Sequence, residues 1–151
     1  MKKTIIKSLL FVGLLLIGIS CEKEYEKEYN WAYPLSGDWT VTVQYGEDSY
    51  GPFFMKTYNS SFGKDSIWID DNGNFWPFKA KAKASVSGLS FETADFTSMP
   101  GTRYEDQVKI TNAKVVNKDS IYFEAVFGSD PETTYKFGGH RRLSYEEYMG
   151  H

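Results

Sequence analysis

The chain has 151 residues, a formal net charge of −3 at pH 7 and one cysteine. Its Lys and Arg residues are scattered rather than gathered in a stripe, which argues against nucleic acid as a partner because phosphate binding requires a basic surface. The single cysteine excludes an internal disulfide, so packing and backbone pairing must stabilise the fold. The length suits one domain with one hydrophobic core.

Residues 1–20 have the pattern of a secretory signal peptide. Three lysines precede an apolar run over 8–19, which is too short to span a bilayer as a helix, and Ser20 follows just before Cys21. Because Cys21 has no second cysteine as a partner, it is predicted to carry the acyl chains of a bacterial lipoprotein after cleavage. Loss of the three lysines changes the formal net charge from −3 to −6.

Two other interpretations of Cys21 are a free thiol left by an ordinary signal cleavage and a reactive catalytic cysteine, which needs a neighbouring base. The preceding Gly18-Ile19-Ser20 departs from the usual lipobox, which has leucine three positions before the cysteine. Residues 21–32 are interpreted as the lipidated cysteine and a charged tether, in which Glu-Lys-Glu-Tyr occurs twice. Lipidation predicts a location in the cell envelope, at the outer membrane. The acidic residues after Cys21 are either a solvated spacer or a sorting signal for the cell surface, as in some Bacteroidota lipoproteins.

Beyond Trp31 the side chains alternate with period two, and Gly, Asn, Asp and Pro interrupt them at short intervals, which is typical of β-strands. Residues 33–151 are therefore predicted to be one all-β domain. In 37–45, Trp39, Val41, Val43 and Tyr45 are expected on one face, and the polar residues between them on the other. The predicted strands are 37–45, 53–59, 65–70, 75–84, 89–96, 107–116, 120–127 and 133–141.

About eight strands joined mostly by short turns predict an antiparallel up-and-down barrel, in which every strand has two neighbours and no sheet edge is exposed. A β-sandwich is the alternative. Residues 143–149 could add a short helical turn against the barrel. The segment 97–106 is long enough to cover a barrel mouth as a lid, with an ordinary connection as the alternative.

The start of the first strand and the end of the last carry a second pattern. Gly37-Asp38-Trp39 together with the basic pair Arg141-Arg142 resembles the lipocalin and calycin signature. The resemblance implies that Trp39 closes the barrel floor beneath a stacked arginine. Alternation along the last strand assigns that role to Arg141, so the predicted closure residues are Gly37, Trp39 and Arg141. The alternative is a tryptophan in an ordinary sheet core.

Further blocks of sequence at 37–39, 65–71, 75–79, 110–112, 119–123 and 135–142 follow in one order. Together they resemble the lipid-binding putative hydrolase family of Bacteroidota lipoproteins. The resemblance implies a calycin-like barrel that binds a lipid or another small hydrophobic molecule, while hydrolase activity is suggested only by the family's name. The family continues with Thr-Gly after the last block, whereas this chain has Leu143-Ser144.

Alternation also places a row of small side chains, including Ala80 and Ala82, on an inner face between outward lysines. Such a row opposite bulky residues favours space for one small ligand, with the alternative that aromatic side chains fill it. The predicted ligand-lining residues are Trp39, Val41, Val43, Ile67, Ile69, Trp76, Phe78, Ala80, Ala82, Phe91, Ile110, Phe123, Tyr135 and Phe137.

Trp68 and Tyr122 fall on the outward parity, which favours two exposed aromatic side chains. Because exposed aromatics can stack on sugars or contact a partner, an interaction or glycan-binding lipoprotein without an internal ligand is the alternative function. A weak esterase is a second alternative. The sequence predicts no cofactor and identifies no protein partner.

The sequence contains no clear catalytic or metal motif. It lacks the Gly-x-Ser-x-Gly elbow, and a triad would have to combine His140 with a pair such as Ser120 and Asp119, which face opposite ways on a strand. Two histidines and one cysteine are too few for a zinc site. Residues 70–74 resemble the start of a calcium loop. However, Phe75 stands where an EF-hand needs glycine and Lys81 where it needs a bidentate glutamate, so the segment is interpreted as a hairpin turn.

Overall fold

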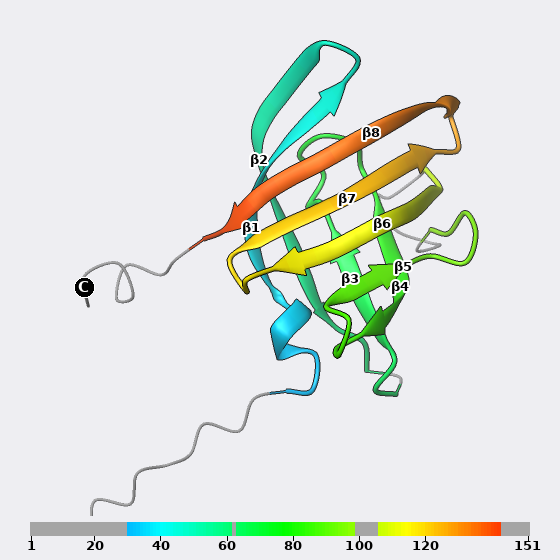
Figure 1. Ribbon diagram of the computed structural model, residues 1–151. Helices are drawn as coiled ribbons and strands as arrows, with labels where there is room; N and C mark the ends of the chain where they lie inside the picture. Colours follow the sequence, from blue (N-terminus) through cyan, green and yellow to red (C-terminus); the bar gives the residue numbers. More distant parts are fainter. Residues whose placement is uncertain (1–29, 62, 99–105, 143–151) are drawn as a thin grey trace, which may run out of the picture.

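The computed structural model describes residues 30–61, 63–98 and 106–142. Antiparallel strands follow one another round a closed barrel, and β8 pairs with β1 to complete it (Figure 1). The predicted up-and-down barrel is therefore confirmed, and the sandwich alternative is wrong. The strands are β1 (Gly37–Tyr45), β2 (Asp48–Asn59), β3 (Ser66–Asp70), β4 (Lys79–Ser85), β5 (Ser90–Glu92), β6 (Val108–Val116), β7 (Ser120–Phe127) and β8 (Asp130–Arg141).

Several predictions lie outside the described residues. They concern the signal peptide at 1–20, Cys21 and most of its tether, the helical turn at 143–149, and most of the lid candidate at 97–106. Among the residues that the structure describes, no helix is long and apolar enough to cross a membrane.

Strict alternation explains the two strands, β1 and β7, whose bounds match the prediction. In β1, Trp39, Val41 and Val43 are buried and the residues between them are not, and β7 alternates in the same way along its length. Tyr45 is a correction. The sequence places it on the inner face, whereas it is 46% exposed in the structure. The reason is that the β1–β2 hairpin extends past the rest of the barrel wall (Figure 1).

Other strands start or end at different residues than the sequence predicts. β2 starts at Asp48 rather than at residue 53, because a register shift opposite Val41 and Val43 accommodates the Gly51-Pro52 pair that predicts a break. β5 ends at Glu92 rather than at residue 96. There the Thr93 hydroxyl, in place of a backbone carbonyl, accepts a hydrogen bond from the Ile110 amide at 2.9 Å.

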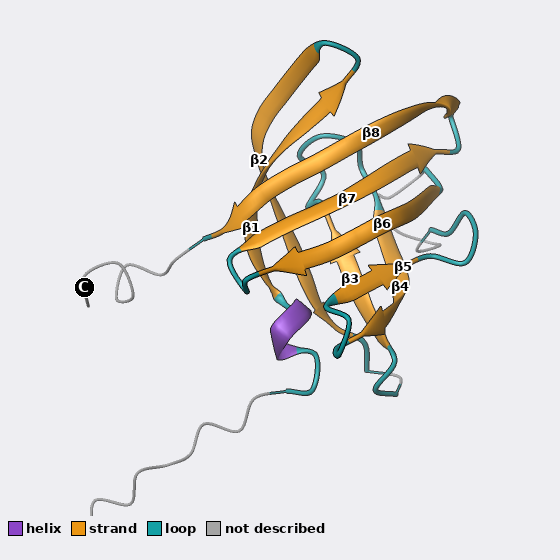
Figure 2. Cartoon of the chain, viewed as in Figure 1, coloured by secondary structure: helices purple, strands orange, loops and turns teal. Residues whose placement is uncertain are grey.

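The two ends of the barrel differ. At one end, which we call the closed end, a single 3-10 turn, η1 (Tyr33–Leu35), lies beneath the start of β1 (Figure 2). Leu35 is fully buried, and its carbonyl accepts a hydrogen bond from the Thr57 hydroxyl, which in turn accepts one from the Trp39 indole. The opposite end, which we call the mouth, is formed by the β1–β2 turn, the loop 71–78, the β7–β8 turn and the described residues of the β5–β6 connection.

Candidate functional site

The closed end is sealed by an arginine stacked on a tryptophan. The Arg141 guanidinium carbon lies 4.5 Å from the centroid of the Trp39 ring. Arg141 also donates hydrogen bonds to the Ser36 carbonyl at 2.5 Å and to the Lys118 carbonyl at 2.8 Å. A Cβ on Gly37 would lie 2.5 Å from Arg141 Nη1, so a side chain there would displace the guanidinium. The glycine of the Gly-x-Trp pattern thus leaves room for the arginine.

The predicted ligand-lining residues face the barrel interior or its mouth, and their side chains are packed together. All of them except Trp76 and Tyr135 are at most 2% exposed. Ala80 and Ala82 have no solvent-accessible surface, so no water-sized space adjoins the alanine row. Of the two alternatives that alternation leaves open, the structure shows the filled interior.

Aromatic rings form a continuous column from the core to the mouth. Deep in the barrel, Phe123 and Phe137 stack with their centroids 4.4 Å apart. Nearer the mouth, Trp76 stacks on Phe127 at 4.7 Å. The column reaches solvent through Tyr45, which lies 5.5 Å from the Tyr135 ring. Its members are Tyr45, Tyr50, Phe53, Phe75, Trp76, Phe78, Phe91, Phe123, Phe127, Tyr135 and Phe137.

Three rings of the column, those of Phe75, Trp76 and Phe78, come from the loop 71–78 rather than from a strand. The sequence places Phe75 and Trp76 at the start of a strand, with Trp76 pointing inward as part of its face. In the structure they belong to the loop 71–78 at the mouth, both are half-buried, and β4 begins only at Lys79. The physical reason for this correction is Asp71, whose role the alternation pattern did not reveal.

The Asp71 carboxylate organises this loop. It is only 3% exposed and accepts hydrogen bonds from the backbone amides of Gly73 (2.7 Å), Phe75 (3.2 Å), Trp76 (3.1 Å) and Phe78 (3.3 Å). Amides bound to a side chain are not available to a strand ladder, which prevents β4 from starting earlier. Burial raises the pKa of Asp71, and the four amide hydrogen bonds offset only part of that effect.

A second carboxylate holds the Trp76 ring. Asp106 accepts a hydrogen bond from Trp76 Nε1 at 2.7 Å, and it also accepts the hydroxyl and the backbone amide of Ser129 in the β7–β8 turn. Burial alone would raise the pKa of Asp106, but the hydrogen bonds from Ser129, Trp76 and the Gln107 amide outweigh it and leave the pKa below its ordinary value. The indole is therefore fixed by an ionised acceptor near neutral pH.

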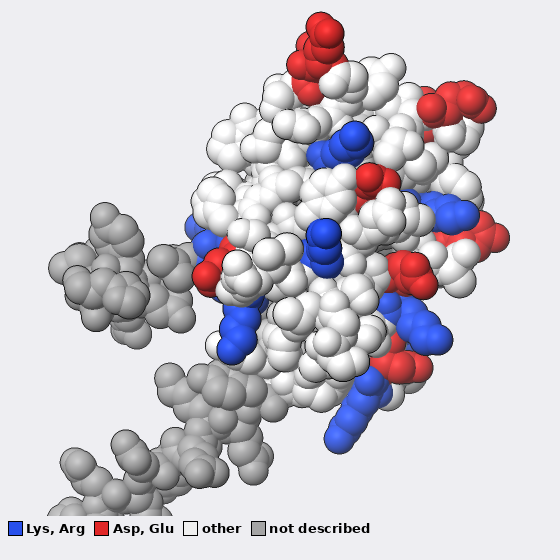
Figure 3. Space-filling view, in the orientation of Figure 1, with Lys and Arg blue, Asp and Glu red and all other residues white. Residues whose placement is uncertain are grey.

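Acidic side chains also surround the mouth. Glu47 and Asp48 lie at the tip of the β1–β2 hairpin, and Asp130 and Glu132 lie at the start of β8. Figure 3 shows acidic side chains at the tip of the hairpin. Asp130 accepts a hydrogen bond from the Tyr135 hydroxyl at 2.9 Å, and burial together with this bond raises the pKa of Tyr135 to about 12. A negative rim repels anions, so this mouth favours a neutral or cationic polar group over a free carboxylate.

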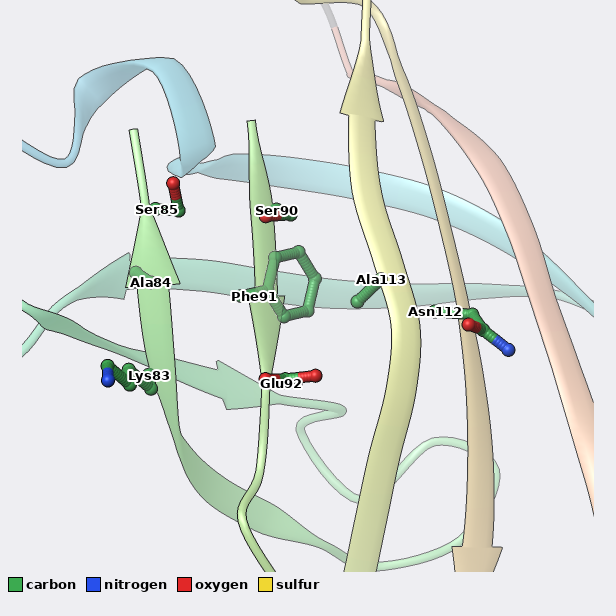
Figure 4. Close-up of a pocket in the computed structure, with 8 residues that line it drawn as sticks. All are labelled: Lys83, Ala84, Ser85, Ser90, Phe91, Glu92, Asn112 and Ala113. Atoms are coloured by element: carbon green, nitrogen blue, oxygen red, sulfur yellow. The ribbon is translucent and has the colours of Figure 1, made fainter. Parts of the chain in front are cut away.

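A trough of about 310 Å³ lies along the barrel wall over β4, β5 and β6 (Figure 4). Phe91 and Ala113 are buried there, while Lys83, Glu92 and Asn112 are exposed. The exposed side chains are polar or charged, which differs from the largely apolar lining of a lipid site. The mouth, with its aromatic column, is therefore the stronger candidate site.

The two aromatics expected on the surface, Trp68 and Tyr122, are only half-buried rather than exposed, which corrects that prediction. The Lys79 ammonium lies 5.3 Å from the Trp68 ring and covers part of it. The Tyr122 hydroxyl donates a hydrogen bond to Glu124 at 2.8 Å. Both rings are therefore less exposed than a surface that stacks on sugars requires, and the Trp68 ring already has a cation above it.

The structure brings together one pair of the catalytic candidates. Ser120 on β7 and His140 on β8 are direct partners across the strand pair, and both are exposed. Asp119 precedes Ser120 in the turn, but no hydrogen bond joins the Ser120 and His140 side chains in the described structure. Within the described ranges, no group of three or more His, Cys, Asp or Glu residues is arranged to hold a metal ion.

No curated protein matches the sequence significantly. One protein family, described as lipid-binding putative hydrolase, has a sequence model that matches residues 24–146. The match spans all the strands of the barrel, including the Trp39 and Arg141 pair of the closed end, and the loop 71–78. The chain therefore belongs to the lipid-binding putative hydrolase family.

Proposed function

We propose that this protein binds a small apolar or amphipathic, lipid-like molecule inside its barrel while an acylated Cys21 holds it in the bacterial cell envelope, at the outer membrane. The signal pattern of residues 1–20 supports the anchor, and the family match supports a lipid ligand. The acidic residues after Cys21 favour export of the anchored protein to the cell surface.

The observation that carries the ligand site is the origin of the uppermost rings. Phe75 and Trp76 complete the aromatic column from a loop, so they can leave it without breaking any strand pairing. A ligand can take their place against Phe127, Tyr135 and Phe137. With the loop in place, the barrel interior is filled. When the loop moves out, the remaining rings of the column form an apolar lining for the ligand.

The energetics favour a largely apolar ligand. Burial of apolar surface is worth about 25 cal/mol per Å², before the costs of association are subtracted. Part of that gain is cancelled, because moving Phe75 and Trp76 out exposes apolar surface of their own. Net binding therefore requires a ligand that buries more apolar surface than the two rings, such as an acyl chain rather than a small polar solute.

Native mass spectrometry of residues 22–151, expressed in bacteria, tests the ligand. This segment contains every strand of the closed barrel, and all strand pairings lie within it. We expect a mass above that of the bare chain, with the extra species released as a lipid on denaturation. A bare chain that takes up no added monoacylglycerol or other neutral lipid would contradict the proposal.

The anchor has a separate test. In the full-length chain, Cys21→Ser removes the only acceptor for lipid, so the protein should move from the membrane fraction to the soluble fraction of the envelope. The N-terminal peptide of the wild-type protein should carry the mass of its acyl chains. An unmodified Cys21 peptide, or a Cys21→Ser protein that stays in the membrane fraction, would rule the anchor out.

A further inference from the structure

The aromatic loop at the mouth has the properties of a plug. Resting on the proposed function, we infer that residues 73–78 close the ligand path and that Asp71 and Asp106 are the positioning residues that hold this plug shut. Both residues lie outside the plug itself, and Asp71 binds it through backbone amides while Asp106 binds it through an indole. Neither was singled out as a site residue by the sequence.

The hydrogen bonds of the loop show why one side chain controls it. In a strand, each backbone amide has its own carbonyl partner, so opening requires many separate bonds to break. Here the amides of Gly73, Phe75, Trp76 and Phe78 converge on the single carboxylate of Asp71. A change at this one group therefore weakens the whole segment at once, while the neighbouring strands keep their ladders.

Asp106 secures the opposite side of the plug. Its carboxylate joins the Trp76 indole to Ser129 in the β7–β8 turn, and the same indole stacks on Phe127 at the end of β7. The Trp76 ring is thereby tied to a part of the barrel that is far from Asp71 in sequence. A third attachment is the Asn74 side chain, whose amide donates hydrogen bonds to the Phe54 carbonyl at 2.6 Å and to the Asp71 carbonyl at 2.7 Å. Asp71 and Asp106 are the two attachments made by a carboxylate, and each can be weakened without altering the other.

Opening would expose a path that is already aromatic on both sides. Outside the plug, Tyr50 lies 6.1 Å from Phe75 and is 43% exposed, so a ligand can first contact the hairpin. Inside it, Phe137 lies 5.9 Å from Phe75 and continues into the core. Within the described residues, the plug is the one loop-borne part of this path, so the inference requires it to move before a ligand can enter.

Stopped-flow fluorescence with the neutral dye N-phenyl-1-naphthylamine tests this inference on residues 22–151. A neutral dye is used because the rim is acidic. Asp71→Asn and Asp106→Asn weaken the two attachments separately, and Asp95→Asn is the matched control. Asp95 lies in the β5–β6 connection and is exposed, and among the described residues its one hydrogen bond is from the adjacent Phe96 amide. Asp95→Asn therefore removes one charge without removing a bond to the plug.

A plug that must open before binding reduces the apparent affinity by the fraction of open molecules. Weakening it should therefore speed association and tighten the apparent Kd, on the order of tenfold for Asp71→Asn and a few-fold for Asp106→Asn. Asp95→Asn should match the wild type. Hydrogen exchange without dye should show faster exchange of the 73, 75, 76 and 78 amides in Asp71→Asn.

Each other outcome counts against the inference. If the wild type binds dye and neither Asp71→Asn nor Asp106→Asn changes the association rate, the plug is wrong and the proposed function stands. If both variants bind more weakly and unfold more easily, the two carboxylates only stabilise the fold. If the wild type and all variants bind no dye, the proposed function fails and the plug fails with it. Asp106→Asn keeps the test valid if Asp71→Asn does not fold.

Discussion

At the scale of single residues, two arginines at the end of β8 provide a matched comparison. Arg141 stacks on the buried Trp39 and donates to two backbone carbonyls, whereas Arg142 lies 4.3 Å from the ring of Phe54, which is 47% exposed. A cation over a desolvated ring is worth more than one over an exposed ring. The two neighbouring arginines should therefore contribute unequally to stability.

We expect Arg141→Lys to lower the free energy of unfolding by about 1–2 kcal/mol. The reason is that the lysine ammonium is not planar, so it cannot stack on Trp39 and donate to both backbone carbonyls at once. Arg142→Lys should cost less than about 0.5 kcal/mol, as is usual for surface changes. Urea unfolding of the two variants measures the difference. Equal effects would mean that Arg141 does not seal the closed end.

The two carboxylates that hold the loop have pKa values shifted in opposite directions. The pKa of Asp106 lies below its ordinary value of 3.8, so the folded state favours its ionised form. This contributes stability above the unfolded pKa, and the contribution is lost as the pH falls through the folded pKa. The pKa of Asp71 is raised, so the folded state favours its protonated form and stability from this group increases as the pH falls through that value.

Acid titration of stability should separate these two signs. Between pH 7 and pH 3, we expect Asp106→Asn to lose less stability than the wild type, because the variant lacks a group whose contribution disappears in acid. Asp71→Asn should lose more than the wild type over the same range. Urea unfolding at several pH values provides the measurement, and the same pH dependence in all three proteins would contradict the assigned shifts.

At the scale of secondary-structure elements, the pairing of β1 with β8 closes the barrel and depends on one close approach. An added Cβ on Gly139 would lie 2.0 Å from the Thr40 carbonyl oxygen and 2.7 Å from the Val41 Cα. Real atoms cannot approach so closely, so the two strands would have to separate. The adjacent Gly138 has open space around the same position.

Gly139→Ala should therefore destabilise the barrel by about 3 kcal/mol or more, since backbone atoms rather than a flexible side chain must move. Gly138→Ala is the control and should change stability by less than about 0.5 kcal/mol. Thermal unfolding of both variants provides the measurement. A tolerated alanine at 139 would show that the β1–β8 register differs from the one described here.

Strand prediction succeeded where burial alone sets the structure and was wrong where a polar side chain intervenes. β1 and β7 have the predicted bounds because one face of each is buried, which makes the alternation regular. The predicted start of β4 was wrong because Trp76 and Phe78 fit the alternation of inward side chains. Their backbone amides donate to Asp71 instead of to a neighbouring strand. An aspartate before a turn is a known signal of such local hydrogen bonding, but its fourth partner lies seven residues away.

At the scale of the whole molecule, the barrel has two ends with different chemistry. The described chain begins at Asn30 at the closed end, beneath the Trp39 and Arg141 seal. The mouth, with its aromatic column and acidic rim, lies at the opposite end (Figure 1). On the proposed function, the anchored side of the chain is the closed end and ligand exchanges at the mouth.

Because all strand pairings and the buried turn η1 lie within residues 30–142, that part of the chain should fold alone. We expect residues 30–142 to unfold in one cooperative transition, with a free energy of unfolding within about 0.5 kcal/mol of that of residues 22–151. Urea unfolding of the two segments measures this. A loss of more than about 2 kcal/mol would show that the terminal segments contribute to the core.

The closed barrel could be predicted from the sequence because eight amphipathic strands with short connections leave few other ways to bury one face. The ligand site could be predicted only in part. Alternation identified the inner residues, but whether rings such as Phe78 and Phe127 fill the interior depends on contacts between segments far apart in the chain. The bond from Trp76 to Asp106 spans 30 residues and leaves no local pattern.

The account depends on an apolar molecule occupying the aromatic column at the mouth, and intermolecular nuclear Overhauser effects measure this directly. In ¹³C-labelled residues 22–151 saturated with N-phenyl-1-naphthylamine, we expect contacts from the dye to the rings of Phe127, Tyr135 and Phe137, with the Phe75 and Trp76 signals shifted. Contacts confined to outward rings such as Trp68 and Tyr122, with the column unchanged, would contradict it.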